Sequence, residues 1–155
     1  MFKKKKSELA ATQDGDCIAL DMVPDQAFSE KLLGDGVAII PRDNIVHSPA
    51  DGKVVQVFET KHAYSIKTDD GLEILVHIGI NTVELKGEGF TPKVSEGQSV
   101  KKGDVLCETD IELIRKKGYE IYTPILITNM QNVKSFNTIL GNVRAGESTV
   151  IEYTV

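Results

Sequence analysis

Two histidines, His62 and His77, are the residues of this chain best suited to covalent chemistry. A neutral imidazole can attack phosphorus near neutral pH without a strong base, because its free pKa is about 6.5. The ring must hold the right tautomer, which requires a hydrogen bond to its other nitrogen, and the Gly79 carbonyl is an available acceptor. A second imidazole can donate to the phosphoryl oxygens or hold charge that develops in a loose transition state. We therefore interpret His77 as a nucleophile for phosphoryl transfer and His62 as its helper.

The two histidines lie on neighbouring strand-like runs, residues 62–67 and 72–79, joined by the turn sequence Thr68-Asp69-Asp70-Gly71. Such a turn predicts a hairpin. In the second run, alternation places four apolar residues on one face: Leu72, Ile74, Val76 and Ile78. The opposite face then carries Glu73, Leu75, His77 and Gly79.

The register of this hairpin decides whether the imidazoles share a face. If residues 68–71 all form the loop, Lys67 pairs with Leu72 and His62 lies directly opposite His77. A tight turn at residues 70–71 makes the histidines diagonal neighbours, whereas a three-residue loop places them on opposite faces. The hypothesis of paired histidines therefore requires an even register.

Other chemistries fit the sequence less well. Paired imidazoles are common zinc ligands, but a catalytic zinc site usually needs three protein ligands. The sequence contains neither H-x-H nor H-E-x-x-H, and the residue four positions after His62 is Ile66. There is also no P-loop and no G-x-G-x-x-G after a strand. We therefore expect no cofactor and no bound nucleotide, and the phosphoryl donor should be another protein.

Length and charge narrow the class of protein further. With 155 residues, 41% of them hydrophobic, the chain fits one domain, which we place at residues 10–155 after a basic flexible tail at 1–9. Four of the 18 basic residues lie in the run Lys3 to Lys6, so 14 remain against 23 acidic residues. Such a body should repel nucleic acid and attract basic partners. Phe2 with the lysine run could also touch anionic lipid, although a solvated tail is the simpler interpretation.

The N-terminus lacks the apolar stretch of a signal peptide, and no run of eighteen apolar residues follows, so we expect a cytoplasmic protein. Cys17 and Cys107 belong to no C-x-x-C pair, which is typical of buried reduced thiols in that compartment.

The remaining elements predict an all-β, antiparallel sandwich or barrel-like fold with a few short helices. Short apolar or alternating runs are broken at close intervals by turn residues. Asp25 can cap a helix over residues 26–33, and Asp110 can cap one over residues 111–117. Residues 11–18 resemble residues 48–55, and residues 100–104 resemble residues 143–147. These echoes indicate duplicated hairpin units within one compact domain.

Residues 71–83, GLEILVHIGINTV, resemble the active-site signature of the glucose-type IIA components of the bacterial phosphoenolpyruvate-dependent sugar phosphotransferase system. The resemblance continues through residues 84–90 and upstream through residues 34–39, 48–52 and 58–63, so it covers nearly the whole chain from about residue 10. It implies an antiparallel β-sandwich with few short helices, in agreement with the turn spacing.

The resemblance also implies a reaction and its residues. His77 would take a phosphoryl group on Nε2 from the phosphorylated histidine carrier protein and pass it to a cysteine on the IIB domain of a sugar permease. This transfer would bring the protein transiently to the inner face of the membrane. His62 would assist, Thr60 would orient His62, and the Gly79 carbonyl would hold Nδ1 of His77.

Partners of this family dock on a shallow apolar ring edged with carboxylates, for which the matching positions here are Phe28, Phe58 and Val83, with Asp25 at the edge. The position after Ile80 is often Asp in the family but is Asn81 here. We expect this change to weaken or alter partner pairing without loss of phosphoryl acceptance, because Asn still accepts a hydrogen bond.

Two alternative functions remain open at this point. Such proteins can also act as regulatory modules that bind enzymes according to phosphorylation state, and a zinc ion shared by His62, His77 and a partner carboxylate is then conceivable. The other alternative is a swinging-arm carrier of the biotinyl or lipoyl type, but Lys67 beside the turn lacks the flanking sequence that such a carrier needs.

Overall fold

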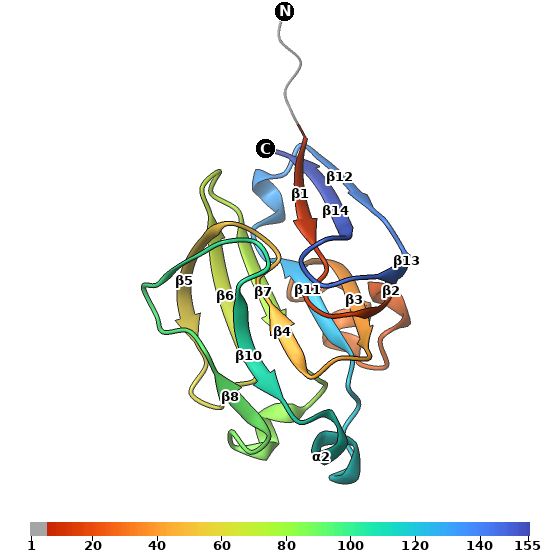
Figure 1. Cartoon of the computed structure of the whole chain (residues 1–155). Helices are drawn as coiled ribbons and strands as arrows, with labels where there is room; N and C mark the ends of the chain where they lie inside the picture. Colours follow the sequence, from red (N-terminus) through yellow and green to blue (C-terminus); the bar gives the residue numbers. More distant parts are fainter. Residues whose placement is uncertain (1–5) are drawn as a thin grey trace, which may run out of the picture.

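The structure is a computed structural model that describes residues 6–155. Residues 1–5, with most of the lysine run, lie outside the described residues. The first strand, β1 (Ser7–Ala10), pairs with the last, β14 (Thr149–Thr154). Leu9 of β1 is fully buried in the core. Strand β1 therefore includes residues 7–9, which we had assigned to the tail. The two strands lie together at one end of the molecule, and helix α2 (Ile111–Lys116) lies at the other (Figure 1).

Three antiparallel sheets form the described body, which confirms the all-β expectation. The largest sheet has eight strands in the order β13 (Gly141–Val143), β2 (Gly15–Ala19), β3 (Asp35–Pro41), β11 (Thr123–Ile127), β7 (Glu73–His77), β6 (Ala63–Thr68), β5 (Gly52–Val57) and β9 (Ser99–Val100). The two smaller sheets have the orders β1-β14-β12 (Ser135–Thr138) and β4 (Ile45–His47)-β10 (Val105–Thr109)-β8 (Phe90–Pro92).

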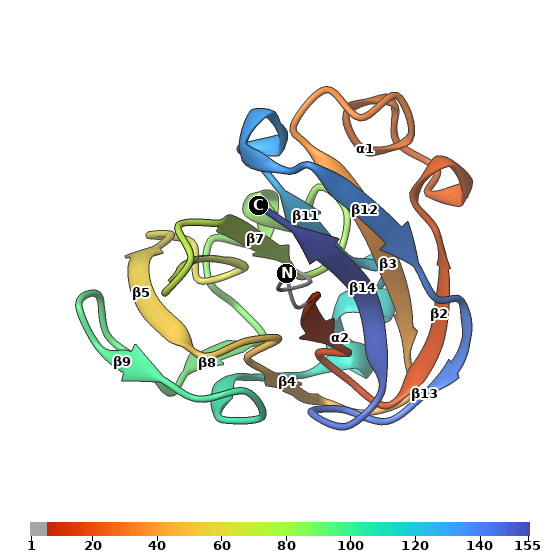
Figure 2. The same cartoon turned by 90° about the horizontal axis from the view of Figure 1, so that it is seen from above.

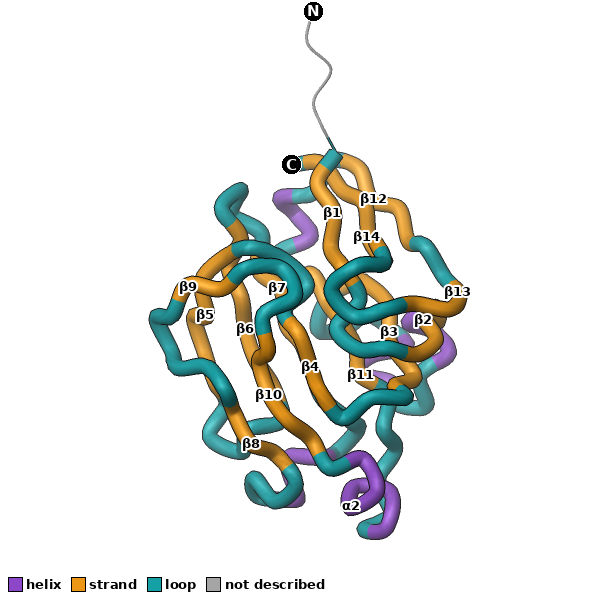
Figure 3. The backbone as a smooth tube through the Cα atoms, viewed as in Figure 1, coloured by secondary structure: helices purple, strands orange, loops and turns teal. Residues whose placement is uncertain are grey.

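Helices are short and lie between strands (Figure 3). Besides α1 (Gln26–Ser29) and α2, the described residues contain three single 3₁₀ turns: η1 (Leu20–Met22), η2 (Thr82–Leu85) and η3 (Met130–Asn132). Both predicted N-caps are present, because Asp25 Oδ1 accepts from Ala27 N at 2.9 Å and Asp110 Oδ1 accepts from Leu113 N at 3.1 Å. No helix within residues 6–155 is long and apolar enough to cross a bilayer.

The predicted echo in the sequence corresponds to a repeated arrangement in space. Asp51 Oδ1 accepts from Lys102 N, and in the matching loop Asp14 Oδ1 accepts from Ala145 N, each at 2.8 Å. Strands β2 and β3 pair as β5 and β6 do, and β13 and β9 occupy the matching edges. Read outward from the β11-β7 pair, the eight-stranded sheet has the same organisation in both directions. The large sheet thus consists of two related halves, and Figure 2 shows β13, β2 and β3 on one side of the molecule and β5 and β9 on the other.

The two faces of the large sheet bury different clusters. Its inner face packs against both smaller sheets and includes Ile74 and Val76 of β7, as the alternation predicted. Its outer face supports a smaller cluster, which contains Phe28 of α1 and, at its margin, Leu75 of β7. Free thiols Cys17 and Cys107 are both buried, as expected. His77 follows the alternation and therefore belongs to the outer face.

The even hairpin register that we predicted is wrong. Ala63 pairs with His77 and Lys67 with Glu73, while Thr68 N donates to Leu72 O at 2.9 Å, so the loop consists of residues 69–71. The physical reason is the Thr68 hydroxyl, which accepts from Leu72 N at 3.0 Å and donates to the carboxylate of Asp70. These side-chain bonds stabilise a three-residue loop that the sequence pattern does not distinguish from a four-residue loop.

Candidate active site

The imidazoles of His62 and His77 meet despite the odd register. Their ring centroids are 4.8 Å apart and their planes cross at 81°. His77 is the last residue of β7, and His62 immediately precedes β6, with its carbonyl accepting from Ile78 N at 2.7 Å. Lys61 has a left-handed φ of 63°, so the chain turns there and the pleat no longer determines the direction of the His62 side chain. The two rings therefore meet at the end of the hairpin, where both strands terminate.

The hydrogen bond of His77 determines its reactive nitrogen. Its Nδ1 lies 2.8 Å from the carbonyl oxygen of Gly79. A carbonyl oxygen can only accept, so Nδ1 carries the proton and the lone pair of the neutral ring is on Nε2. Gly79 has φ of 79°, a conformation in which glycine is favoured, and the carbonyl can thus reach back to a side chain two residues earlier.

His62 is held by a polar contact and by aromatic neighbours. Its Nδ1 lies 2.8 Å from Oγ1 of Thr60. Its ring makes an edge contact with Phe58, at a centroid distance of 5.7 Å, and a tilted contact with Phe90 at 6.5 Å. Only 3% of His62 is exposed to solvent, so its ring has little freedom to reorient.

Burial keeps both imidazoles neutral. The pKa of His77 is lowered to about 4, chiefly by desolvation and also by the neighbouring His62, while the hydrogen bond to Gly79 and the charge of Asp25 oppose the shift. Desolvation also lowers the pKa of His62, against a hydrogen bond to the backbone of Thr60. Near neutral pH the pair therefore presents two uncharged rings, of which His77 has a free nucleophilic lone pair.

The residues expected to form the docking ring around the histidines differ in burial and in their contact with the two imidazoles. Phe28 is buried and contacts His77 edge-on at a centroid distance of 5.0 Å. Phe58 is half-buried beside His62, whereas Val83 is 49% exposed on η2. Asp25 lies close enough to His77 to influence its pKa, and Asn81 is exposed with a left-handed φ of 61°. The structure thus combines an apolar surround with one nearby carboxylate.

Sequence reasoning missed the residues that support the turn after β7. Phe90 gave no signal beyond its apolar side chain, and Thr82 appeared only as part of the motif. The segment 120–122 lies far away in the sequence, yet Gly79 N donates to Tyr122 O and Ile80 N donates to Glu120 O, each at 2.9 Å. Only the three-dimensional fold brings this segment to the site.

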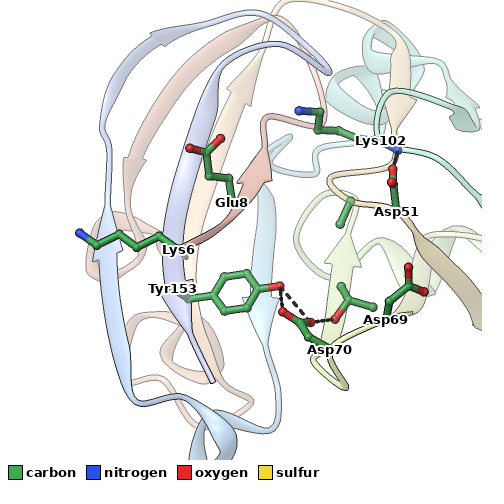
Figure 4. A pocket seen from close by; sticks show the side chains of 9 residues that line it. Lys6, Glu8, Asp51, Asp69, Asp70, Lys102 and Tyr153 are labelled. Carbon is green, nitrogen blue, oxygen red and sulfur yellow. Dashed lines mark hydrogen bonds between the residues drawn. The ribbon is translucent and has the colours of Figure 1, made fainter. Parts of the chain in front are cut away.

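A separate cavity of about 600 Å³ opens at the other end of the β6-β7 hairpin (Figure 4). Its floor is a network in which Asp70 accepts hydrogen bonds from Thr68, Ser7 and Tyr153. Asp51, also in the lining, accepts from the backbone of Lys102. These bonds join β1 and β14 to the hairpin tip, so we assign the network a structural role. No cluster of three or more metal-ligating side chains occurs in the described part of the chain.

Known proteins resemble this chain in sequence and in structure. The family model described as phosphoenolpyruvate-dependent sugar phosphotransferase system, EIIA 1, matches residues 7–133. A glucose-specific EIIA component of this system from Haemophilus influenzae is 46% identical over 149 residues, which are 96% of this chain and 90% of the relative. Its counterpart from Buchnera aphidicola subsp. Acyrthosiphon pisum is 43% identical over 150 residues, 97% and 93% of the two chains.

A solved structure agrees with these sequence matches. The glucose permease IIA from Mycoplasma capricolum superposes with a TM-score of 0.91 at 42% identity and covers 97% of this chain and 98% of that chain. This likeness confirms the antiparallel sandwich expected from the sequence, and the family match confirms the resemblance carried by residues 71–83.

Proposed function

The chain belongs to the EIIA 1 family of the phosphoenolpyruvate-dependent sugar phosphotransferase system, and we propose that it carries a phosphoryl group on Nε2 of His77. The observation that supports this assignment best is the hydrogen bond between His77 Nδ1 and the Gly79 carbonyl. It leaves Nε2 unprotonated beside a second imidazole, as a nitrogen nucleophile requires.

The proposed acceptance step transfers the phosphoryl group between two nitrogens. The Nε2 lone pair of His77 attacks phosphorus on the phosphohistidine of the incoming carrier protein. As the new N–P bond forms, the old N–P bond breaks and its electron pair returns to the carrier's nitrogen. The proton on Nδ1 of His77 stays in its bond to Gly79, so no proton transfer is needed. In the second step a thiolate of a IIB domain attacks phosphorus, and the N–P pair returns to Nε2.

His62 serves the transfer as an electrostatic helper. Its ring lies against that of His77, within reach of oxygens on a phosphoryl group at Nε2. Protonated or hydrogen-bonded to those oxygens, it offsets the charge that they carry in the loose transition state. Thr60 orients the ring through its contact with Nδ1. We expect His62 to matter most in the step that passes the group onward.

Partner proteins dock over the histidines in this proposal. The apolar residues Phe28, Phe58 and Val83 supply contact area, and Asp25 supplies charge at the edge. Because the chain carries 23 acidic against 18 basic residues, a basic carrier protein would be attracted at long range. A transient complex with the IIB domain of a permease would place the protein at the inner face of the membrane.

The test is incubation with phosphoenolpyruvate, enzyme I and the histidine carrier protein, followed by mass measurement of the intact chain. We expect one acid-labile phosphoryl group on the wild type and none on His77→Ala. His62→Ala should accept the group but pass it on at least about tenfold more slowly. His47→Ala, which removes an imidazole from β4, is the matched control and should behave as the wild type. Acid-labile label on His77→Ala would refute the assignment.

A further inference from the structure

Gly79 takes part in two peptide groups, Ile78–Gly79 and Gly79–Ile80, and in each of them both the C=O and the N–H are hydrogen-bonded. In the second group, Gly79–Ile80, the Gly79 carbonyl accepts from His77 Nδ1, and Ile80 N donates to Glu120 O at 2.9 Å. Because a peptide group is planar, holding its N–H also fixes the direction of its C=O. The tautomer of His77 therefore depends on the orientation of this peptide group.

The first peptide group is fixed in the same way, and here a side chain takes part. Gly79 N donates to Tyr122 O at 2.9 Å, and the Ile78 carbonyl accepts from the hydroxyl of Thr82. The left-handed φ of Asn81, 61°, lets the chain return so that Thr82 reaches a carbonyl four residues earlier. Thr82 is fully buried, so its hydroxyl has no competing water.

Thr82 also limits the space around Gly79. A β-carbon placed on Gly79 would lie 2.5 Å from the methyl carbon of Thr82 and 3.2 Å from the carbonyl oxygen of Glu120. The threonine therefore contacts the turn through both branches, the hydroxyl on one carbonyl and the methyl on the glycine. Packing of this kind leaves the turn little room to rotate.

We propose that Thr82 is a positioning residue for phosphoryl transfer, which holds the Gly79 turn so that His77 keeps its proton on Nδ1 and its lone pair on Nε2. Thr82 does not touch the reacting atoms in this role. It acts through two peptide groups, whereas Thr60 contacts the helper histidine directly. The inference rests on the proposed function for its consequence in catalysis, but the effect on the ring of His77 is independent of it.

The experiment uses the full chain and separates the two branches of the side chain. Thr82→Val keeps the shape and removes the donor, and Thr82→Ser keeps the donor and removes the methyl group. Thr109→Val is the matched control, because Thr109 of β10 is also buried and its hydroxyl donates at 2.7 Å to the carbonyl of Asn44, which lies just before β4. The ring nitrogens of His77 are followed by ¹⁵N NMR near neutral pH, and the rate of phosphoryl acceptance is measured alongside thermal stability.

We expect Thr82→Val to change His77 from a single Nδ1–H tautomer to a mixture and to slow phosphoryl acceptance about tenfold, since small misplacements of a reacting group are costly in rate. Thr82→Ser should keep both close to the wild type. Thr109→Val should lose stability without either effect. If Thr82→Val does not fold, Thr82→Cys replaces it, because a thiol is a poor donor.

The proposal would be overturned if Thr82→Val showed the same His77 ring spectra and the same rate of phosphoryl acceptance as the wild type. It would also be overturned if Thr109→Val changed both as much as Thr82→Val does. A wild type that is never phosphorylated on His77 would instead refute the proposed function, while the ring spectra would still decide the assignment of Thr82.

Discussion

Replacing His77 with glutamine should make the stability of the protein less sensitive to acid. Burial lowers the pKa of His77 in the folded state from 6.5 to about 4. Between these values the unfolded chain binds a proton that the folded protein does not, so the free energy of unfolding rises with pH. The stabilising contribution is fully present above pH 6.5 and is lost as the pH falls towards 4.

The size of the effect follows from the same shift. At 1.36 kcal/mol per pKa unit, the change from pH 7 to pH 5 costs the folded state about 2 kcal/mol through His77 alone. Glutamine has a polar side chain but does not titrate, so His77→Gln should lose about 2 kcal/mol less than the wild type over this interval. Carboxylates that also titrate below pH 5 contribute to both proteins and cancel in the comparison.

The assay is denaturant unfolding at pH 7, pH 6 and pH 5 for the wild type, His77→Gln and His47→Gln. The last variant removes one imidazole from β4, outside the site, and corrects for effects of the exchange itself. Parallel pH curves for the wild type and His77→Gln would show that the folded protein protonates His77 as readily as the unfolded chain does. NMR titration of the ring gives a direct check, and a midpoint between pH 6 and pH 7 would equally refute the reasoning.

Two further substitutions test the turn and the rim of the site. Gly79→Ala places a β-carbon 2.5 Å from the methyl carbon of Thr82 at a positive φ, so we expect a loss of about 2–4 kcal/mol in unfolding free energy and little phosphorylation. Gly71→Ala shares a positive φ of 88° with no atom within 4 Å, and should lose only about 1 kcal/mol. Equal losses would contradict the steric argument. Asn81→Asp should speed phosphoryl transfer with arginine-bearing partners about two- to tenfold at low salt. The gain should be smaller at high salt, because salt screens the added charge. Unchanged rates with every partner would contradict the role of this position.

Much of the fold could be predicted from local pattern, because burial enforces alternation. The inward face of β7 and the caps at Asp25 and Asp110 agree with the sequence prediction. Helix α1 is shorter than predicted and ends at Ser29, because Lys31 adopts a left-handed φ of 59°. Leu32, which continues the helical pattern in the sequence, is 70% exposed instead.

The site was predictable in composition more than in geometry. Paired imidazoles and the Gly79 acceptor follow from residue type and spacing, but the register that was to bring the rings together was wrong. The register depends on the side-chain bonds of Thr68 in the loop, and the meeting of the rings depends on the left-handed conformation of Lys61. Backbone segments at residues 120–122 had no local signal, since sequence spacing carries no information on a contact between distant strands.

The eight-stranded sheet has the same organisation on both sides of the β11-β7 pair, yet these two central strands carry different side chains at equivalent places. Symmetry relates β7 to β11, and the outer face that carries Leu75 and His77 in β7 carries Leu126 in β11. Leu126 is fully buried and belongs to the same apolar cluster as Phe28. On this face β11 therefore offers an apolar side chain for packing, where β7 offers an imidazole. Substitutions at Leu126 are constrained by volume and hydrophobicity rather than by proton placement.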